Sequence, residues 1–331
     1  EEEEEEEDVI MIEDEVVREA ASVDDLSANT FKDYTPSMFT AKIFAPHPEK
    51  LQETSALANA TPLPHNYKLH LPLRTVMDCL TAAQLETISL ACAQHERPFL
   101  RRSRTRKSQE SSEERPGFFL GDETGVGKGR QAAGTIFENW VLGRRKAVWF
   151  SCSADLMVDA TRDMIDIGAG NIPMFNLRDF KKGAKLFTKD GLKGGCVMFC
   201  TYALLVGEDR YEQLQAWLGD EFDGVLIFDE AHRCKNSGTT KVKGGPQEDL
   251  AGGGREVTVG GSKTAQRVIE LQMDCPSARV VYVSATGACA PRHLEFMRRL
   301  ELWGDGTAFD DFSSFETAIS KGGLQQMELV A

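Results

Sequence analysis

A glycine-rich segment with one lysine contains the residues of this 331-residue sequence that are best suited to chemistry. It runs from Pro116 to Arg130 and reads PGFFLGDETGVGKGR. Glycines let backbone N–H groups converge on phosphate oxygens, a following helix N-terminus adds a positive dipole end, and a lysine reaches the outer phosphates. We therefore expect a phosphate-binding loop formed by Thr124, Gly125, Val126, Gly127, Lys128, Gly129 and Arg130.

Two positions in this segment depart from the pattern G-x-x-x-x-G-K-[ST] of such loops. Asp122 stands at the first glycine, and Gly129 stands where a Ser or Thr hydroxyl would bind magnesium. A segment this rich in glycine is also compatible with an ordinary turn between a strand and a helix. Residues further along the chain decide between the two interpretations.

A pair of adjacent carboxylates follows an apolar run in the segment GVLIFDEAH, which ends at His232. At the end of a buried strand, Asp229 would hold Mg²⁺ on the phosphates, while Glu230 would orient and deprotonate an attacking water. Acids at strand ends are often only solvated, but an unbroken apolar strand and an upstream phosphate loop favour the catalytic interpretation. His232 would couple this site to a neighbouring element, although a single histidine is more often a packing residue.

A third motif, Ser-Ala-Thr, follows the apolar run Val280–Val283. The hydroxyls of Ser284 and Thr286 would hydrogen-bond His232 or Glu230 and relay the state of the phosphate. The motif alone has little value. The three motifs together, in this order and each at the end of an apolar strand, indicate a nucleotide site.

Short apolar runs alternate with helical patterns from Phe118 onward, which predicts a mainly parallel sheet covered by helices on both faces. In such sheets ligands bind at the carboxyl ends of the strands. The expected strands are Phe118–Leu120, Ala147–Ser151, Ile172–Phe175, Cys196–Cys200, Val225–Phe228 and Val280–Val283, and the expected helices are Gln131–Leu142, Ala154–Ile167, Tyr211–Leu218, Lys263–Met273, Pro291–Leu300 and Ser313–Ile319.

The segments before the sheet differ in composition from the rest. Residues 1–30 begin with eight acidic residues and are predicted to be a disordered tail. The Pro-punctuated residues 31–79 predict an extended arm, and residues 80–331 the lobe itself. Within that lobe, the basic, serine-rich residues 97–115 and the glycine-rich residues 237–261 predict flexible insertions.

A helix is expected from Leu80 to His95, with Thr81 as its N-cap. Gln84 lies in its first turn. An amide there is usually solvated, but its paired donor and acceptor also suit the edge of an adenine base.

The composition limits the class of protein. The formal net charge is −14, and more than half of it comes from the acidic start, so the total argues against strong nonspecific binding of DNA by the whole chain. The eight cysteines form no C-x-x-C pair, which favours free thiols over disulfides or zinc. The sequence contains no apolar run of membrane-spanning length and no signal peptide, so we expect an intracellular protein without membrane contact.

The ordered motifs resemble the first RecA-like lobe of helicase superfamily 2, and within it the Strawberry notch family. The resemblance covers roughly Phe39 to Ala331 and rests on GVGKGR, the stretch from WFSCSADL to DIGA, FDGVLIFDEAHRCKN, ARVVYVSATGA, LWGDGTAF and MELVA. It implies that Gln84 contacts adenine and that ATP and Mg²⁺ are the cofactors. It also implies that Lys128 belongs to motif I, Asp229 and Glu230 to motif II, and Ser284 and Thr286 to motif III. A glycine after the lysine is similar to the form of motif I in this family.

The family implies a nuclear regulator of transcription or chromatin, with transcription or chromatin proteins as partners. DNA or RNA would meet the residues around Ser151, Ser153, Thr201 and Tyr202. ATP hydrolysis in this class needs a second RecA-like lobe, for which the residues after the Ser-Ala-Thr motif are too few. The alternatives are a scaffold without appreciable ATP turnover and a bacterial or viral helicase fused to a DNA-modifying enzyme, the latter disfavoured by the acidic N-terminus.

Overall fold

The computed structural model describes residues 31–39, 44–54, 66–97, 101–104, 111–186, 194–231, 240–243, 256–259, 263–284, 294–304 and 307–328. The chain divides into two units, one of residues 1–34 and 52–61 and one of residues 35–51 and 62–331. In the first unit, strands β1 (Phe31–Asp33) and β2 (Gln52–Thr54) pair antiparallel. The predicted tail, residues 1–30, lies outside the described residues.

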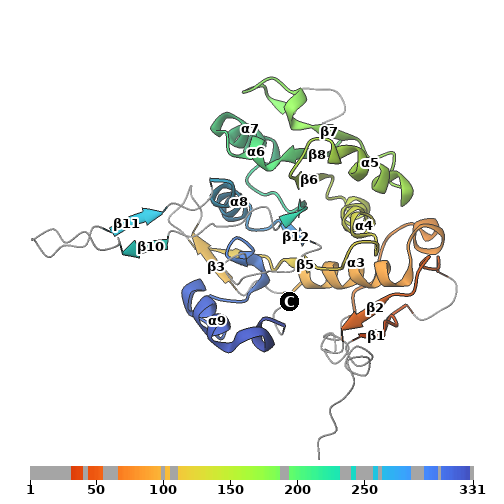
Figure 1. Cartoon of the computed structure of the whole chain (residues 1–331). Coiled ribbons are helices and arrows are strands. Elements are labelled where there is room, and N and C mark those ends of the chain that lie inside the picture. Colours follow the sequence, from red (N-terminus) through yellow and green to blue (C-terminus); the bar gives the residue numbers. More distant parts are fainter. Residues whose placement is uncertain are drawn as a thin grey trace, which may run out of the picture. The chain divides into compact units, whose positions relative to one another are not determined.

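A six-stranded sheet forms the centre of the second unit (Figure 1). Its strand order is β5-β12-β9-β6-β8-β7, and all neighbouring strands run parallel. The strands are β5 (Phe118–Leu120), β12 (Arg279–Val283), β9 (Val225–Phe228), β6 (Lys146–Ser151), β8 (Cys196–Thr201) and β7 (Met174–Asn176). The predicted fold class is confirmed, because each expected apolar run forms one strand of this sheet.

Helices cover both faces of the sheet because alternate residues of each strand point to opposite sides. Ala147 and Trp149 of β6 pack on one face, while Val148 and Phe150 pack on the other. The first face carries α3 (Ala82–His95), α4 (Lys128–Val141) and α5 (Leu156–Asp166). The second carries α6 (Tyr202–Leu205), α7 (Glu208–Leu218), α8 (Lys263–Asp274) and α9 (Phe312–Glu328).

Helix α3 begins where the sequence predicts. Thr81 is its N-cap, and its side chain accepts a hydrogen bond from the Gln84 amide while the Gln84 side chain accepts one from the Thr81 amide. This reciprocal capping box satisfies two amides that the helix itself leaves unpaired. It also fixes the Gln84 side chain at the start of the helix.

The two predicted insertions contain regular structure. In residues 97–115, strand β3 (Arg101–Arg104) pairs antiparallel with β4 (Ser111–Glu114). The Glu114 carboxylate is buried and lies 3.0 Å from the guanidinium of Arg298, which ties β4 to the lobe. In residues 237–261, β10 (Thr240–Lys243) pairs antiparallel with β11 (Glu256–Val259).

The predicted helix Pro291–Leu300 is wrong for its described part. Residues 294–300 form turns and one 3₁₀ turn, Arg298–Leu300. The physical reason is the fully buried Arg299, whose guanidinium donates hydrogen bonds to four backbone carbonyls, those of Arg115, Gln272, Cys275 and Pro276. Those contacts hold the chain in a tight irregular path that sequence periodicity does not reveal.

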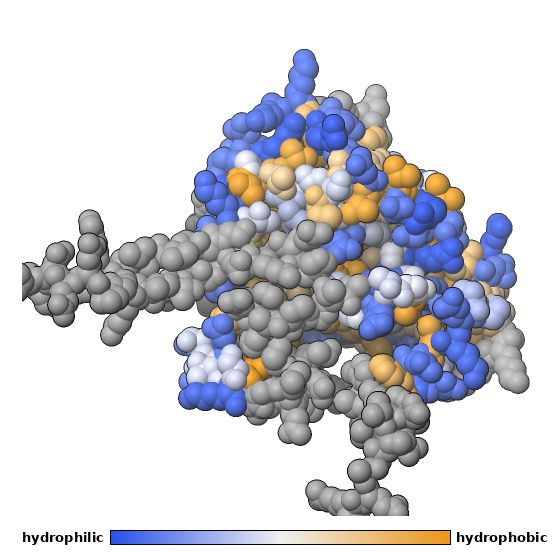
Figure 2. Space-filling view, in the orientation of Figure 1, coloured by the Kyte–Doolittle hydropathy of each residue, from blue (hydrophilic) through white to orange (hydrophobic). Residues whose placement is uncertain are grey.

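The arm residues of the second unit lie along α3 and α4. Ala45 forms an isolated parallel bridge with Thr81, and the backbone amide of Ser37 donates to the Glu86 carboxylate at 3.1 Å. Thr75–Cys79 forms a short π-type turn before α3. On the face shown in Figure 2, apolar residues form small separate patches among polar ones, as is usual for a protein surface.

Candidate nucleotide site

The phosphate-loop residues connect β5 to α4. Gly125 and Gly127 have φ angles of 100° and 91°, a left-handed conformation that is costly for residues with a side chain. Gly127 is the N-cap of α4 and provides no side-chain cap for the first turn. The backbone amides of the first turn of α4 therefore donate to no capping side chain of the N-cap residue. This is the arrangement that binds phosphate in loops of this type.

Lys128 joins the loop to the acidic motif. Its Nζ donates hydrogen bonds to the carbonyls of Asp122, at 2.7 Å, and Glu123, at 2.8 Å. Burial lowers the pKa of Lys128, and the nearby carboxylates of Asp122, Glu230 and Asp229 oppose that effect. The charges of both acids of the second motif thus act on Lys128, although they are far apart in the sequence, because β5 and β9 lie on either side of β12.

Asp229 follows the last residue of β9 and is held by residues of β6 and α6 and by Glu230. Its amide donates to the Phe150 carbonyl at 2.9 Å, and its carboxylate accepts from the Ser151 hydroxyl at 3.2 Å. The Glu230 amide donates to the same carboxylate at 2.9 Å, and the Tyr202 hydroxyl donates to the Asp229 carbonyl at 2.7 Å. These contacts fix the direction of the Asp229 side chain at the edge of the sheet.

Glu230 has a φ of 51°, one of two left-handed non-glycine residues in the described part of the chain. Such a conformation stores about 1–3 kcal/mol and is common at functional sites. His232 lies outside the described residues.

The acidic pair fits a divalent cation. Burial raises the pKa of Asp229, and the negative charge of Glu230 raises it further. A cation would relieve both causes, since it neutralises the pair and replaces lost solvation. Among the described residues, no group of three His, Cys, Asp or Glu side chains could hold a metal. Magnesium nevertheless fits, because it commonly uses one or two carboxylates together with phosphate oxygens and water.

Gln84 supports the loop from α3. It is buried, and its side-chain nitrogen donates to the Val126 carbonyl at 2.9 Å while its oxygen accepts from the Thr81 amide. Both amide groups are therefore engaged within the protein. The contact between Gln84 and adenine stays a prediction. The structure shows a different role, because the hydrogen bond from Gln84 to Val126 links α3 to the loop.

The remaining predicted residues lie around the loop or outside the described part. Arg130 forms an ion pair of 2.7 Å with Asp166 of α5. Ser284 is buried, and its amide donates to the Leu120 carbonyl at 3.1 Å, which places the end of β12 beside the start of the loop. Thr286 falls outside the described residues. The Thr124 side chain is exposed at the top of the loop.

The residues predicted to meet a nucleic-acid backbone are mostly turned inward. Ser151 is fully buried and bonded to Asp229, and the Thr201 hydroxyl caps α6 by accepting from the Leu204 amide. Tyr202 is buried and bonded to Asp229. Ser153 accepts from the amide of Asp155 in an exposed turn. Sequence reasoning missed the support that Ser151 and Tyr202 give to Asp229, because it depends on which strands become neighbours.

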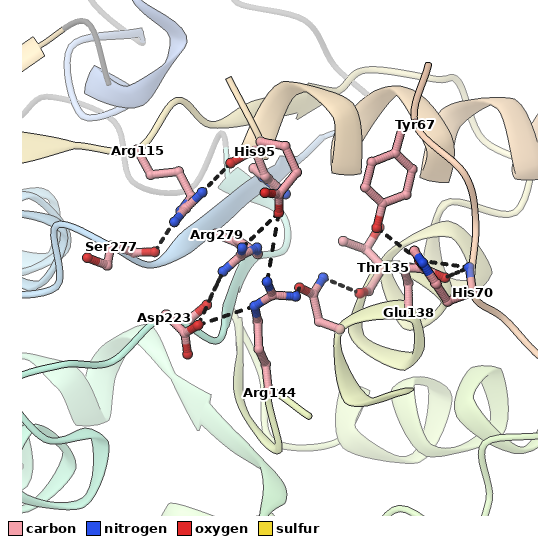
Figure 3. Close-up of polar contacts among 12 residues, drawn as sticks. Tyr67, His70, His95, Arg115, Thr135, Glu138, Arg144, Asp223, Ser277 and Arg279 are labelled. Atoms are coloured by element: carbon pink, nitrogen blue, oxygen red, sulfur yellow. Dashed lines mark hydrogen bonds and ion pairs between the residues drawn. The ribbon is translucent and has the colours of Figure 1, made fainter. Parts of the chain in front are cut away.

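A separate depression of about 340 Å³ lies at the opposite edge of the sheet. Residues before β6, β8 and β9 line it, including Arg144, Gly195 and Asp223. Ligands of parallel α/β sheets bind at the carboxyl ends of strands. This depression is at their amino ends, beside the ion cluster in which Arg144 pairs with Asp223 at 3.2 Å and Arg279 with Glu96 at 2.8 Å (Figure 3).

A family profile described as "P-loop containing NTP hydrolase pore-1" matches residues 46–331. The match covers most of the chain, and the chain therefore belongs to this family of P-loop NTP hydrolases. The predicted resemblance to the Strawberry notch family is also confirmed. Over 316 residues the chain is 41% identical to Protein strawberry notch homolog 1 of Gallus gallus, covering 92% of the chain and 23% of that protein.

Further relatives show the same partial match. Protein strawberry notch of Drosophila melanogaster is 41% identical over 331 residues, covering 96% of the chain and 18% of that protein. Protein FORGETTER 1 of Arabidopsis thaliana is 40% identical over 315 residues, covering 92% and 22%. The chain thus spans about a fifth of the length of the curated relatives it matches.

Among solved structures, the Sulfolobus solfataricus SWI2/SNF2 ATPase core domain is similar, with 15% identity and a TM-score of 0.45 over 82% of this chain and 44% of that one. The same ATPase core in complex with dsDNA has a TM-score of 0.39 over 65% and 38%. Within the described residues, no helix is long and apolar enough to cross a membrane.

Proposed function

We propose that this chain is the ATP-binding first lobe of a helicase-like ATPase, which hydrolyses ATP when a second RecA-like lobe is present. The observation that carries the proposal is that the glycine-rich loop follows β5 and the acidic pair follows β9, two parallel strands on either side of β12, so both motifs lie at the carboxyl edge of the sheet. Family membership supports it. We extend the proposal to a nuclear regulator of transcription or chromatin, as the sequence resemblance to the Strawberry notch family implies.

Each residue has a separate task in this proposal. The amides after Gly127 bind the phosphates, and Lys128 leaves the carbonyls of Asp122 and Glu123 to reach the outer phosphate oxygens. Asp229 would hold Mg²⁺, which when bound neutralises charge that develops on the phosphates. Glu230 accepts the proton of the attacking water and orients it. An arginine from the second lobe would stabilise the remaining negative charge.

Calorimetry with ATP and Mg²⁺ tests the binding part. The wild-type chain should bind, Lys128→Ala should bind much more weakly, and Lys182→Ala, an exposed lysine away from the loop, should behave as wild type. Equal affinity in all three would contradict the proposed site.

Hydrolysis is tested on a longer chain that includes the second lobe, with and without DNA or RNA. Glu230→Gln should keep Mg-ATP binding but reduce turnover by about 10²-fold or more. Stimulation by one nucleic acid would identify the partner. Turnover that is indifferent to both Lys128→Ala and Glu230→Gln would overturn the proposal.

A second candidate is a protein-interaction scaffold without appreciable turnover. Gly129 favours it, because motif I lacks the hydroxyl that usually contacts magnesium. A scaffold with an inactive site predicts no binding heat with Mg-ATP, or binding without hydrolysis in the two-lobe protein. The measurements above therefore separate the two functions.

A further inference from the structure

The space beside Gly129 is filled by a carboxylate from another helix. Gly129 is the second residue of α4, and a Cβ built on it would overlap the Oδ2 of Asp163 on α5. The carboxyl carbon of Asp163 lies only 2.8 Å from that Cβ position. A serine or threonine therefore does not fit at residue 129 while the Asp163 side chain keeps its place.

The same geometry places the Asp163 oxygen near the position of the missing hydroxyl. A hydroxyl oxygen at residue 129 would be one covalent bond from the Cβ. Because Oδ2 overlaps that Cβ, Oδ2 and the absent hydroxyl lie within a few ångström of one another. The chain thus presents an oxygen in the region where related loops present Ser or Thr.

The neighbouring contacts hold α5 in this register. Arg130 pairs with Asp166 at 2.7 Å. Gly129 and Arg130, which are successive residues of α4, therefore lie next to Asp163 and Asp166, which are about one turn apart on α5. Within the described part of the chain, the ion pair of Asp163 is a long one, with the Arg162 guanidinium at 4.0 Å, and its side chain is 17% exposed. Burial raises its pKa, as expected for a carboxylate with too little compensating charge.

We propose that Asp163 replaces the motif I hydroxyl and positions magnesium at the nucleotide site, through a bridging water. This inference rests on the proposed ATP site. Magnesium normally keeps several waters, so an acid beyond its first shell can orient it.

The test compares nucleotide affinity with and without the metal. Calorimetric titrations with ADP are run in Mg²⁺ and in EDTA. The dissociation constant in EDTA divided by the dissociation constant in Mg²⁺ gives the magnesium dependence. Asp163→Asn and Asp163→Ala should reduce this ratio about 10- to 100-fold, as losses of outer-shell metal partners do. Asp159→Asn, an exposed acid on the same helix, is the matched control and should keep the wild-type ratio.

A double variant tests whether Asp163 and the hydroxyl are interchangeable. Gly129→Ser alone should bind weakly, because the serine meets the Asp163 carboxylate. Gly129→Ser combined with Asp163→Ala should recover the magnesium dependence, since the space is then free for the hydroxyl. Titration with Mn²⁺, followed by electron paramagnetic resonance in the presence of ADP, reports the metal directly and does not rely on turnover.

The outcomes separate the two proposals. Urea unfolding without nucleotide should show that Asp163→Ala is folded, because its carboxylate has no close hydrogen bond to lose. If wild type binds Mg-nucleotide and both Asp163 variants keep its magnesium dependence, Asp163 is only a helix contact and this inference is overturned. If wild type itself does not bind nucleotide, the proposed function fails, and this inference fails with it.

Discussion

Two acids, Glu138 on the P-loop helix α4 and Asp229 after strand β9, have very different surroundings. Glu138, near the end of α4, is fully buried and its carboxylate accepts hydrogen bonds from the Tyr67 hydroxyl at 2.9 Å and from the His70 amide at 2.8 Å (Figure 3). The His70 Nδ1 lies 2.8 Å from the same carboxylate. These partners come from the arm, so Glu138 fastens the arm to the helix that bears the loop.

Asp229 is partly buried, and its carboxylate lies next to a like charge. It accepts from one hydroxyl and from the amide of the next residue, Glu230, whose negative charge opposes it. Burial and that charge leave the ionised form of Asp229 poorly compensated. The difference indicates that Glu138 is compensated within the protein, whereas Asp229 gains from a bound cation.

The largest expected effect on stability comes from removing the Glu138 carboxylate, which accepts hydrogen bonds from the arm. Glu138→Ala should lower the free energy of unfolding by about 3 kcal/mol, because the Tyr67 hydroxyl and the His70 amide lose a buried, charged acceptor. Tyr67→Phe, which removes one hydroxyl, should cost about 1–2 kcal/mol. Urea unfolding at constant pH measures both. Stability equal to wild type in Glu138→Ala would show that the arm is not fastened by this residue.

A smaller effect of opposite sign is expected at Asp229. Asp229→Asn should raise the free energy of unfolding of the nucleotide-free chain at neutral pH, although it should weaken Mg-nucleotide binding, because asparagine avoids burying a poorly compensated charge.

The pH dependence of this gain has a definite sign. The pKa of Asp229 is raised above its usual 3.8 in the folded state, so the stability that its protonated form contributes is present below that value and is lost as pH rises through the folded pKa. The advantage of Asp229→Asn over wild type should therefore grow as pH increases from about 4 to 7. Unfolding free energies of both proteins across that range check it, and a constant difference would contradict the assigned cause.

The smallest expected effect concerns the hydrogen bond between Gln84 and the Val126 carbonyl of the loop. Gln84→Ala removes the hydrogen bond to the Val126 carbonyl and should weaken nucleotide binding by about 1 kcal/mol, roughly fivefold. Thr87→Ala removes a hydroxyl that bonds within the same helix, to the Ala83 carbonyl, and serves as the control. Comparable affinities for the two variants would mean that the hydrogen bond from Gln84 does not order the loop.

Much of the fold follows from the local pattern. The runs Val225–Phe228 and Val280–Val283 are continuous and apolar because both faces of a parallel strand are buried, so their identity as strands is visible in the residues themselves. The cap at Thr81 is equally local, since the residues that bond each other are three positions apart. Those predictions need no knowledge of distant parts of the chain.

Other features depend on partners that the sequence separates. The predicted helix before Leu300 fails because a buried arginine bonds to four distant carbonyls. The predicted surface role of Ser151 changes for a similar reason, since the pairing of β6 with β9 turns it toward Asp229. Which strands become neighbours is set by the path of the whole chain.

The glycine-rich loop and the acidic pair were determined by the sequence alone, because glycine, lysine and carboxylate are needed there for their own chemistry and conformation. Only the tertiary structure brought the loop and the acidic pair to one edge of the sheet, bonded Gln84 to the loop, and set Asp163 against Gly129. Those relations depend on the order of strands in the sheet and on the contact between α4 and α5. Each arises from packing between segments far apart in the chain, which no local pattern records.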